Sequence, residues 1–279
     1  MKAFLFLAFL TTMLHADHHK IEIMLTVPRT VSTAFERSIM ARGDHKVFHE
    51  PWGGCYLYYR GMNPSPPLPE LLEAKNYDGI KSLFYSYAKE KPVFAKDMVW
   101  LMCDELINDK AFLSDPDVSI TILIRNPAQS IESFYLKLKE YEHINNEFAV
   151  QYSYLIFRYD QLLQIAEKYH ELRGVWPLII EAEELCAHPK EIMTTYCQYA
   201  GIDFKEEALS WEQKMPEEWV QVARWATDAA KSEGFFVPKR GSEKARFSSL
   251  PEECIPALEQ LYQAQLPVYE KLKALSKGF

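Results

Sequence analysis

Five short runs of apolar and β-branched residues recur along the chain, and segments with helical patterns separate them. Within each run the apolar residues are nearly continuous, which is typical of strands covered on both faces. The pattern predicts an α/β fold with a central parallel sheet flanked by helices. Parallel strands end at one edge of a sheet, where ligand-facing loops begin. The predicted strands are Ile21 to Val27, Lys46 to His49, Val93 to Lys96, Val118 to Ile124 and Leu178 to Ile180.

Two of the intervening segments carry helix signals. In the first, Asn126 is an N-cap candidate and Pro127 suits a first turn. Apolar side chains then recur with helical spacing at Ile131, Phe134, Tyr135 and Leu138. The second predicted helix runs from Pro189 to Ala200, and Gly201 suits its C-terminal stop. A third segment, residues 63–70, contains four prolines and is expected to be irregular. It serves either as a plain connection or as a wall of a substrate pocket.

The composition limits the classes of partner. Lys and Arg total 31 against 39 Asp and Glu, giving a net charge of −8, which argues against a nucleic-acid or anionic-membrane surface. With 48% apolar residues the chain can form a core without disulfides. The five cysteines are scattered singly and are expected to be buried reduced thiols. We expect residues 17–279 to form a single α/β domain.

The first sixteen residues resemble a short signal peptide. Met1-Lys2 precedes an apolar run over residues 3–14, and Leu14-His15-Ala16 fits a cleavage site. The run is too short for a membrane span, which needs about 20 apolar residues, so no stable membrane anchor is expected. The protein is exported if residues 1–16 are a signal peptide, and cytoplasmic if they reflect a wrongly assigned start codon.

Residues 25–37 predict a strand that ends in a hydroxyl-rich turn and continues into a helix. The first turn of a helix presents unpaired N–H groups and a positive dipole end, so this segment suits an anion. Arg29 and the Ser32 and Thr33 hydroxyls add donors, although either hydroxyl could instead be a simple N-cap. The backbone N–H groups predicted to form the cradle are those of Thr30, Val31, Ser32 and Thr33.

This segment lacks the glycines and the lysine of the G-x-x-x-x-G-K-[ST] loop, which disfavours a nucleotide-dependent kinase. It resembles instead the 5′-phosphosulfate-binding loop of the sulfotransferase superfamily. In that family a strand ends in Pro, a basic residue and a Ser/Thr-rich turn. The resemblance implies that Arg29 lies near the transferred sulfate and its bridging oxygen.

Residues 123–135 resemble the strand and helix that bind the 3′-phosphate in the same family. There an Arg at the strand end and a Ser eight residues later share one phosphate, and Arg125 and Ser133 occupy those positions here. An Arg side chain can hold a phosphate through two hydrogen bonds. The resemblance therefore implies that Arg125 and Ser133 bind the 3′-phosphate of a nucleotide.

Lys239, Arg240 and Gly241 resemble the late basic-glycine loop that closes over the same phosphate, although the tryptophan usual a few residues later is missing. Together the segments are similar to a bacterial, small-molecule sulfotransferase subgroup over residues 21 to about 247. This resemblance implies a P-loop type of fold and 3′-phosphoadenosine 5′-phosphosulfate (PAPS) as donor. It also implies an alcohol, phenol or amine as acceptor, and no metal.

The acceptor needs a general base, for which three residues compete. Relatives that modify glycans place a Glu soon after the second strand, where Glu50 lies, and His49 precedes it. Cytosolic relatives place a His after a Lys on a middle strand, where this chain has Asp97. The aromatic residues that follow Glu50 would raise its pKa by burial, which favours Glu50 over His49 and Asp97. Glu50 could also be a structural hydrogen-bond acceptor.

The acceptor itself is expected to be an apolar or aromatic small molecule, because the proline-rich segment and the aromatic cluster around Tyr56 suggest an apolar pocket. A different class of function also fits the sequence, a non-catalytic protein that binds the phosphonucleotide. The oligomeric state is left open.

Overall fold

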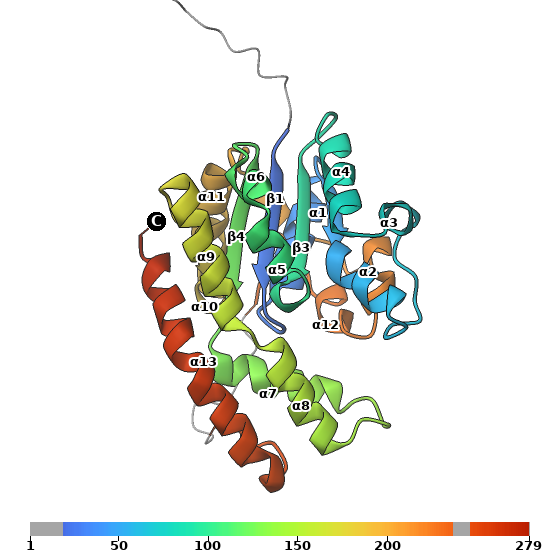
Figure 1. Ribbon diagram of the computed structural model, residues 1–279, viewed down its shortest axis with the longest axis vertical. Coiled ribbons are helices and arrows are strands. Elements are labelled where there is room, and N and C mark those ends of the chain that lie inside the picture. The colour runs from blue at the N-terminus through green and yellow to red at the C-terminus, as the bar shows by residue number, and fades with distance from the viewer. Residues whose placement is uncertain (1–18, 237–245, 279) are drawn as a thin grey trace, which may run out of the picture.

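The computed structural model describes residues 19–236 and 246–278 (Figure 1). These residues form a five-stranded parallel sheet in the order β2-β3-β1-β4-β5. The predicted α/β class is confirmed, and each predicted strand is right to within two residues. The strands are β1 Ile21–Thr26, β2 Lys46–His49, β3 Val93–Met98, β4 Val118–Ile124 and β5 Leu178–Glu181. The signal-peptide prediction for residues 1–16 and the predicted loop at Lys239, Arg240 and Gly241 lie outside the described residues.

Thirteen α-helices occur in the described part of the chain. They are α1 Ser32–Arg42, α2 Pro51–Tyr59, α3 Pro69–Ala74, α4 Tyr77–Tyr87, α5 Cys103–Asn108, α6 Lys110–Ser114, α7 Pro127–Leu138, α8 Asn146–Ile156, α9 Tyr159–Arg173, α10 Ala182–Ala187, α11 Pro189–Ala200, α12 Thr227–Ala230 and α13 Ile255–Ser276. Short 3₁₀ segments are η1 Val99–Leu101, η2 Glu206–Leu209, η3 Glu217–Val222 and η4 Glu252–Cys254. None of the described helices combines the length and the apolar character needed to cross a lipid bilayer.

Both helices predicted from sequence are confirmed. The Asn126 side chain accepts a hydrogen bond from the N–H of Ala128 at 3.0 Å and so caps α7, whose four predicted apolar residues are buried. Helix α11 has the predicted bounds, and Gly201 ends it in a left-handed conformation with φ of 71°. The proline-rich segment is irregular only to Leu68, because α3 begins at Pro69, a favoured first position for proline.

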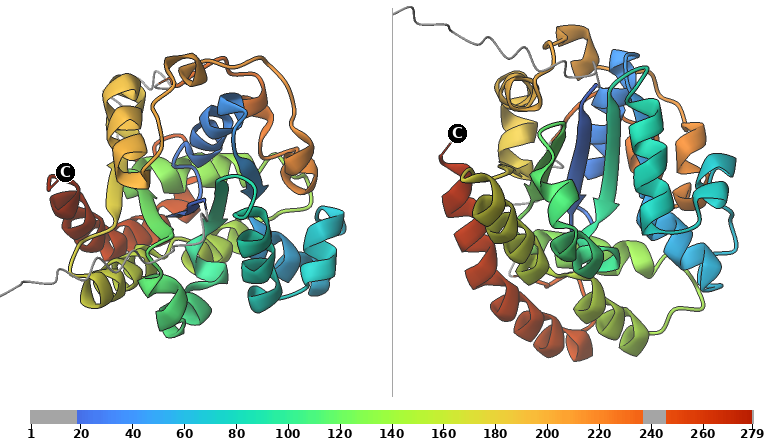
Figure 2. Two further views of the ribbon diagram at one scale, coloured as in Figure 1. Left: turned by 90° about the horizontal axis from the view of Figure 1, so that it is seen from above. Right: turned by 45° about the horizontal axis from the view of Figure 1, so that its top comes forward.

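Helices cover both faces of the sheet (Figure 2). On one face Ile23 and Leu25 of β1 belong to a large apolar core shared with α4, α9 and α13. On the other face Met24 packs in a smaller core with α1 and α11. Successive strand residues point to opposite faces, so both sets must be apolar. This double coverage explains why the strand segments show no polar alternation.

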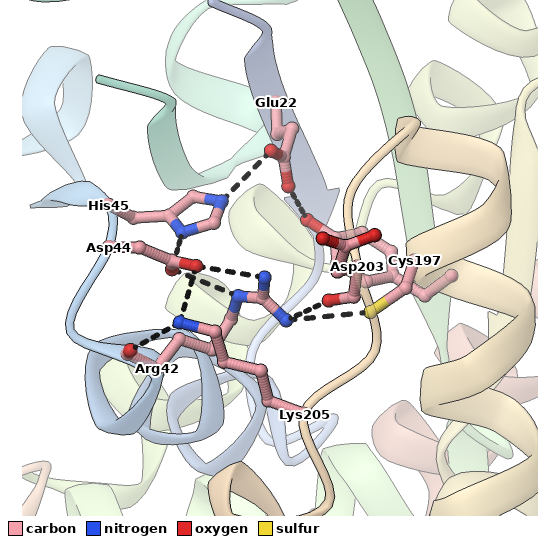
Figure 3. Close-up of polar contacts among 8 residues, drawn as sticks. Glu22, Arg42, Asp44, His45, Cys197, Asp203 and Lys205 are labelled. Carbon is pink, nitrogen blue, oxygen red and sulfur yellow. Dashed lines mark hydrogen bonds and ion pairs between the residues drawn. The ribbon is translucent and has the colours of Figure 1, made fainter. Parts of the chain in front are cut away.

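A partly buried polar network crosses the sheet edge at which the strands begin (Figure 3). The His45 ring lies between two carboxylates, with Nε2 at 3.1 Å from Glu22 and Nδ1 at 2.5 Å from Asp44. Asp44 also accepts from Arg42 at 3.1 Å and from Lys205 at 2.7 Å. The network ties the end of α1 to β1, β2 and the segment after α11. It lies at the opposite edge of the sheet from the strand ends, so Arg42 and Asp44 have a structural role.

Replacing Asp44 by Asn is expected to lower the free energy of unfolding by about 1 kcal/mol near neutral pH. Burial raises the pKa of Asp44, but its hydrogen bonds with Lys205, His45 and Arg42 outweigh burial and hold the pKa well below 3.8. A carboxyl whose pKa is lower in the folded state stabilises above its unfolded-state pKa and loses that contribution as the pH falls. Melting curves of the variant and the wild type should therefore converge on acidification below about pH 4.

A matched control is Glu171→Gln, which removes the exposed ion pair with Lys168 at 2.6 Å. Exposed pairs contribute little to stability, so the melting curve of this variant is expected to coincide with that of the wild type. Equal effects at the two positions would show that the buried network adds no stability.

Candidate functional site

The strand order opens a crevice at the carboxyl edge of the sheet, between β1 and β4. From β1 the chain proceeds to β2 on one side, and from β4 it proceeds to β5 on the other. Loops that leave neighbouring strands in opposite directions form the usual ligand crevice of an open α/β sheet. The register pairs Thr26 with Leu123, which brings Arg125 beside the turn that follows β1. The two predicted phosphate-binding segments are therefore neighbours.

Threonine hydroxyls hold the turn between β1 and α1. Thr26 Oγ1 lies 2.5 Å from Thr30 Oγ1 and donates to the carbonyl oxygen of Leu123 at 2.8 Å. Within this turn Arg29 and Val31 both have positive φ, 64° and 61°. A β-branched residue such as valine is seldom found in this region because it is strained there, and such strain concentrates at ligand sites.

The start of α1 has no side-chain cap. Val31 is the N-cap residue and makes no capping bond, so neither the Ser32 nor the Thr33 hydroxyl is the N-cap. Among the described residues, none accepts a hydrogen bond from the backbone N–H groups of residues 30–33. Alternating backbone handedness followed by a helix start turns successive N–H groups toward one concave surface. This segment therefore has the donors and the dipole of an anion cradle.

Arginine side chains connect the cradle to α7. Arg29 donates from Nε to Ser133 Oγ at 3.1 Å, and its Nη2 lies 3.3 Å from the exposed Asp228 carboxylate. Arg125 donates to the carbonyl oxygen of Arg29 at 2.9 Å and to Gln129 at 3.0 Å. Arg29 thus reaches Ser133, which the family resemblance assigns to the other phosphate. The two predicted subsites are in direct contact.

One cavity of about 700 Å³ collects the predicted residues. Residues 29–33, Arg125 and Ser133 line its polar part, and His49 and Glu50 line another part. Aromatic side chains form much of the remaining wall, contributed by Trp100, Phe134, Tyr152, Trp225 and Phe236. The proline-rich segment contributes Asn63 to the lining, and Cys186 is also part of it.

Glu50 differs from its predicted electrostatic state. Burial alone would raise its pKa, but Lys96, whose Nζ lies 2.5 Å from Oε1, and the neighbouring His49 hold the pKa below its ordinary value. The expected rise through the aromatic cluster is therefore wrong. Tyr56 and Tyr59 of that cluster are 40% and 52% exposed and lie outside the cavity lining. Glu50 is a carboxylate held by a lysine.

Lys96 and Asp97 point to opposite faces of the sheet because they are neighbours on β3. Lys96 reaches Glu50, whereas Asp97 accepts from the backbone N–H groups of Trp52 at 2.8 Å and Gly53 at 3.1 Å. Burial and the Glu50 charge raise the pKa of Asp97 to about 7. Asp97 is fully buried and lies outside the cavity lining, and its carboxylate pairs with the N–H groups at the start of α2. A side chain at Gly53 would come within 2.9 Å of its carboxylate.

His49 belongs to the cavity lining, and its two ring nitrogens have different surroundings. Its Nδ1 lies 2.7 Å from Glu36 Oε2, a contact that joins the end of β2 to α1. Its Nε2 is buried without a hydrogen-bond partner among the described residues, and Glu50 Oε1 lies 3.5 Å away. Buried polar atoms are normally paired, so this nitrogen retains an unused hydrogen-bonding capacity.

Sequence reasoning missed four residues around the cavity: Glu36, Lys96 as an ion-pair partner, Gln129 and Asp228. Lys96 carried a signal, since a charged residue inside an apolar strand needs a partner. Glu36 carried none, because its burial follows from the packing of α1 on the sheet. Within the described ranges, no cluster of three or more His, Cys, Asp or Glu side chains could hold a metal ion.

The parallel sheet defines an α/β protein, and the uncapped helix start and the two arginines form a candidate anion site at the carboxyl edge of that sheet. Residues 20–276 match the family described as Sulfotransferase domain. This match spans most of the chain, so the chain belongs to the sulfotransferase family.

The sequence identity to individual relatives is below 30%. The chain is 28% identical over 242 residues to branched-chain-amino-acid aminotransferase-like protein 2 of Arabidopsis thaliana, covering 83% of this chain and 39% of that protein. It is 29% identical over 112 residues to sulfotransferase ppzF of Metarhizium majus (strain ARSEF 297), covering 37% of this chain and 33% of that protein. The chain thus spans well under half the length of these relatives.

Solved structures that resemble the chain include the sulfotransferase from Alicyclobacillus acidocaldarius, with a TM-score of 0.49 and 16% identity over 93% of this chain and 96% of that one. Another is the sulfotransferase domain from the curacin biosynthetic pathway, with a TM-score of 0.46 and 16% identity over 87% and 97%.

The strained N-cap predicts an unusual order of stability. Val31→Gly is expected to be more stable than Val31→Ala by about 1 kcal/mol, because only glycine adopts positive φ without strain. Both variants lose the valine side chain, so the comparison isolates the backbone. Within α1 itself the order should reverse, with Ala34→Gly in the first turn destabilising by up to about 1 kcal/mol. Chemical denaturation measures the stability of all three variants. A Val31→Gly variant that is less stable than Val31→Ala would show that the turn stores no strain.

Proposed function

We propose that this protein transfers a sulfuryl group from PAPS to a hydroxyl or amine of a small acceptor. The observation that carries the proposal is the convergence of the uncapped helix start, Arg29, Arg125 and Ser133 on one cavity. The net charge of the chain is −8, so a cluster of cations and free N–H groups is a local feature suited to an anion. Family membership supports the sulfuryl chemistry.

The donor carries phosphate at both ends of its ribose, and the cavity offers donors for both. In this proposal the N–H groups of residues 30–33 bind the 5′-phosphate, and Arg125 with Ser133 binds the 3′-phosphate. Arg29, linked to Ser133 in the structure, would release the weak and exposed Asp228 pair and turn to the sulfate.

In the proposed reaction the acceptor oxygen or nitrogen attacks sulfur in line with the leaving group. A new O–S or N–S bond forms while the bond from sulfur to the bridging phosphate oxygen breaks, and 3′-phosphoadenosine 5′-phosphate leaves with the electron pair. The proton of the acceptor passes to a base. Arg29 and the helix start would stabilise the charge that develops on the leaving phosphate, so positioning and electrostatics supply most of the catalysis.

His49 is the base that the geometry favours. The Asp97 carboxylate lies away from the cavity and accepts hydrogen bonds from backbone N–H groups. Glu50 forms an ion pair with Lys96, and this pairing weakens Glu50 as a base. His49 Nε2 has no hydrogen-bond partner among the described residues, and His49 belongs to the cavity lining. Glu50, 3.5 Å from Nε2, would stabilise the imidazolium that forms.

The acceptor in this proposal is a molecule with an apolar or aromatic body that carries one nucleophilic group. The same cavity that His49 and Glu50 line has aromatic walls at Trp100, Phe134, Tyr152 and Trp225. Such walls bind by burial of apolar surface, and the few polar groups orient the reacting atom.

Binding of 3′-phosphoadenosine 5′-phosphate tests the donor site. At 100 times its dissociation constant a ligand stabilises by about 2.7 kcal/mol, which raises the melting temperature by about 5–10 °C in a chain of this size. The Arg125→Ala variant should lose most of this shift in melting temperature, because the 3′-phosphate loses the arginine that would hold it through two hydrogen bonds. The shift is measured relative to the same variant without ligand. Arg158→Ala is the control, since Arg158 pairs with Asp160 at 2.7 Å away from the cavity lining. An equal shift with ATP and Mg²⁺ would instead favour a kinase-like site.

Turnover tests the base. His49→Gln is expected to lower kcat by a factor on the order of 10² to 10⁴ while leaving bisphosphate binding intact. Glu50→Gln should retain more turnover, because Glu50 only supports the imidazolium. Transfer of radiolabelled sulfate from PAPS to a panel of alcohols, phenols and amines measures both. A greater loss of turnover in Glu50→Gln than in His49→Gln would assign the role of base to Glu50. An absence of sulfate transfer with intact bisphosphate binding would identify a non-catalytic binding protein.

A further inference from the structure

The geometry points to Glu36 as a positioning residue that holds His49 in the tautomer and orientation of a base. This inference rests on the proposed sulfuryl transfer. No role was predicted for Glu36 from the sequence, and it lies on α1 one turn after the anion cradle.

The Glu36 carboxylate is fully buried and receives two hydrogen bonds from different elements. Its Oε2 lies 2.7 Å from His49 Nδ1, and its Oε1 accepts from Trp219 Nε1 at 2.9 Å. A buried carboxylate is costly unless its oxygens are satisfied, and here each oxygen has one donor. Trp219, itself fully buried, lies in η3 and fixes one side of the carboxylate.

These two contacts determine where the imidazole carries its proton. An ionised carboxylate only accepts hydrogen bonds, so His49 must donate from Nδ1–H. In the neutral ring the lone pair then lies on Nε2, which has no hydrogen-bond partner among the described residues, and His49 itself belongs to the cavity lining. A His oriented in this way by a buried acid is the arrangement that supports general-base catalysis.

Glu36 also connects the base to the donor site. Thr33, in the first turn of α1, is three residues from Glu36, and residues at this spacing share one helix face. A single rigid helix therefore carries both the phosphate cradle and the group that orients His49. After proton transfer the imidazolium would lie between two carboxylates, Glu36 at 2.7 Å and Glu50 at 3.5 Å.

Glu36→Gln tests the inference because Trp219 decides how the amide lies. The indole N–H can only donate, so it takes the amide oxygen and leaves the NH₂ group facing His49 Nδ1. His49 must then accept at Nδ1 and carry its proton on Nε2, where it cannot act as a base. We expect kcat to fall by a factor on the order of 10² to 10⁴, with bisphosphate binding unchanged.

The tautomer is read directly by ¹⁵N–¹H correlation spectra of the histidine ring, recorded at a pH where His49 is neutral. The wild type is expected to carry its proton on Nδ1, and Glu36→Gln on Nε2. This measurement needs no turnover, so it separates the inference from the proposed function. A wild-type protein with the proton on Nε2 would overturn the role of Glu36 even if sulfuryl transfer were established, and absent transfer with the expected tautomers would leave the orientation standing.

A second variant distinguishes orientation from simple structural support. In Glu36→Gln combined with Trp219→Phe, the indole donor is gone and the amide can turn its oxygen toward Nδ1–H. The double variant is expected to regain at least about tenfold in kcat over Glu36→Gln. Trp219→Phe alone should keep the wild-type tautomer. If the double variant is no more active than the single one, while both bind the bisphosphate, Glu36 does not act through the tautomer of His49.

Discussion

The hydrogen bond from Arg125 to the carbonyl oxygen of Arg29 joins the two loops on which the site depends. It exists because β1 and β4 are parallel neighbours whose carboxyl ends meet at one edge of the sheet. The hydroxyl contacts among Thr26, Thr30 and the β4 backbone then hold the turn in a strained conformation. Without that register, the helix start and the two arginines would not share one cavity.

The pleat of the strands divides the charged residues between the two faces of the sheet. Lys96 and Asp97 are adjacent in sequence, yet one neutralises Glu50 at the cavity and the other satisfies the start of α2. The same alternation turns His49 toward α1, where Glu36 meets it. Electrostatic roles at this edge are therefore set by which face a side chain occupies more than by its chemical type.

Local signals predicted much of the fold and part of the site. Apolar runs located all five strands, and the Asn126 cap located the start of α7. The turn after β1 and the strand end at Arg125 were both placed correctly in one cavity. The state of Glu50 was not predictable in this way, because Tyr56 and Tyr59 of the aromatic cluster are exposed while Lys96, forty-six positions away, reaches the Glu50 carboxylate. The N-cap of α1 was also missed, since a valine in a left-handed conformation has no local signal.

The sequence by itself determined the secondary structure and the two basic strand ends, because hydrogen bonding and burial over a few residues depend on the nearest side chains. Only the tertiary structure decided which of His49, Glu50 and Asp97 faces the cavity and in what state. That choice depends on charges and donors from distant segments, namely Glu36 on α1, Lys96 on β3 and Trp219 on η3. Charge interactions act through space, and their partners are known only once the chain has folded.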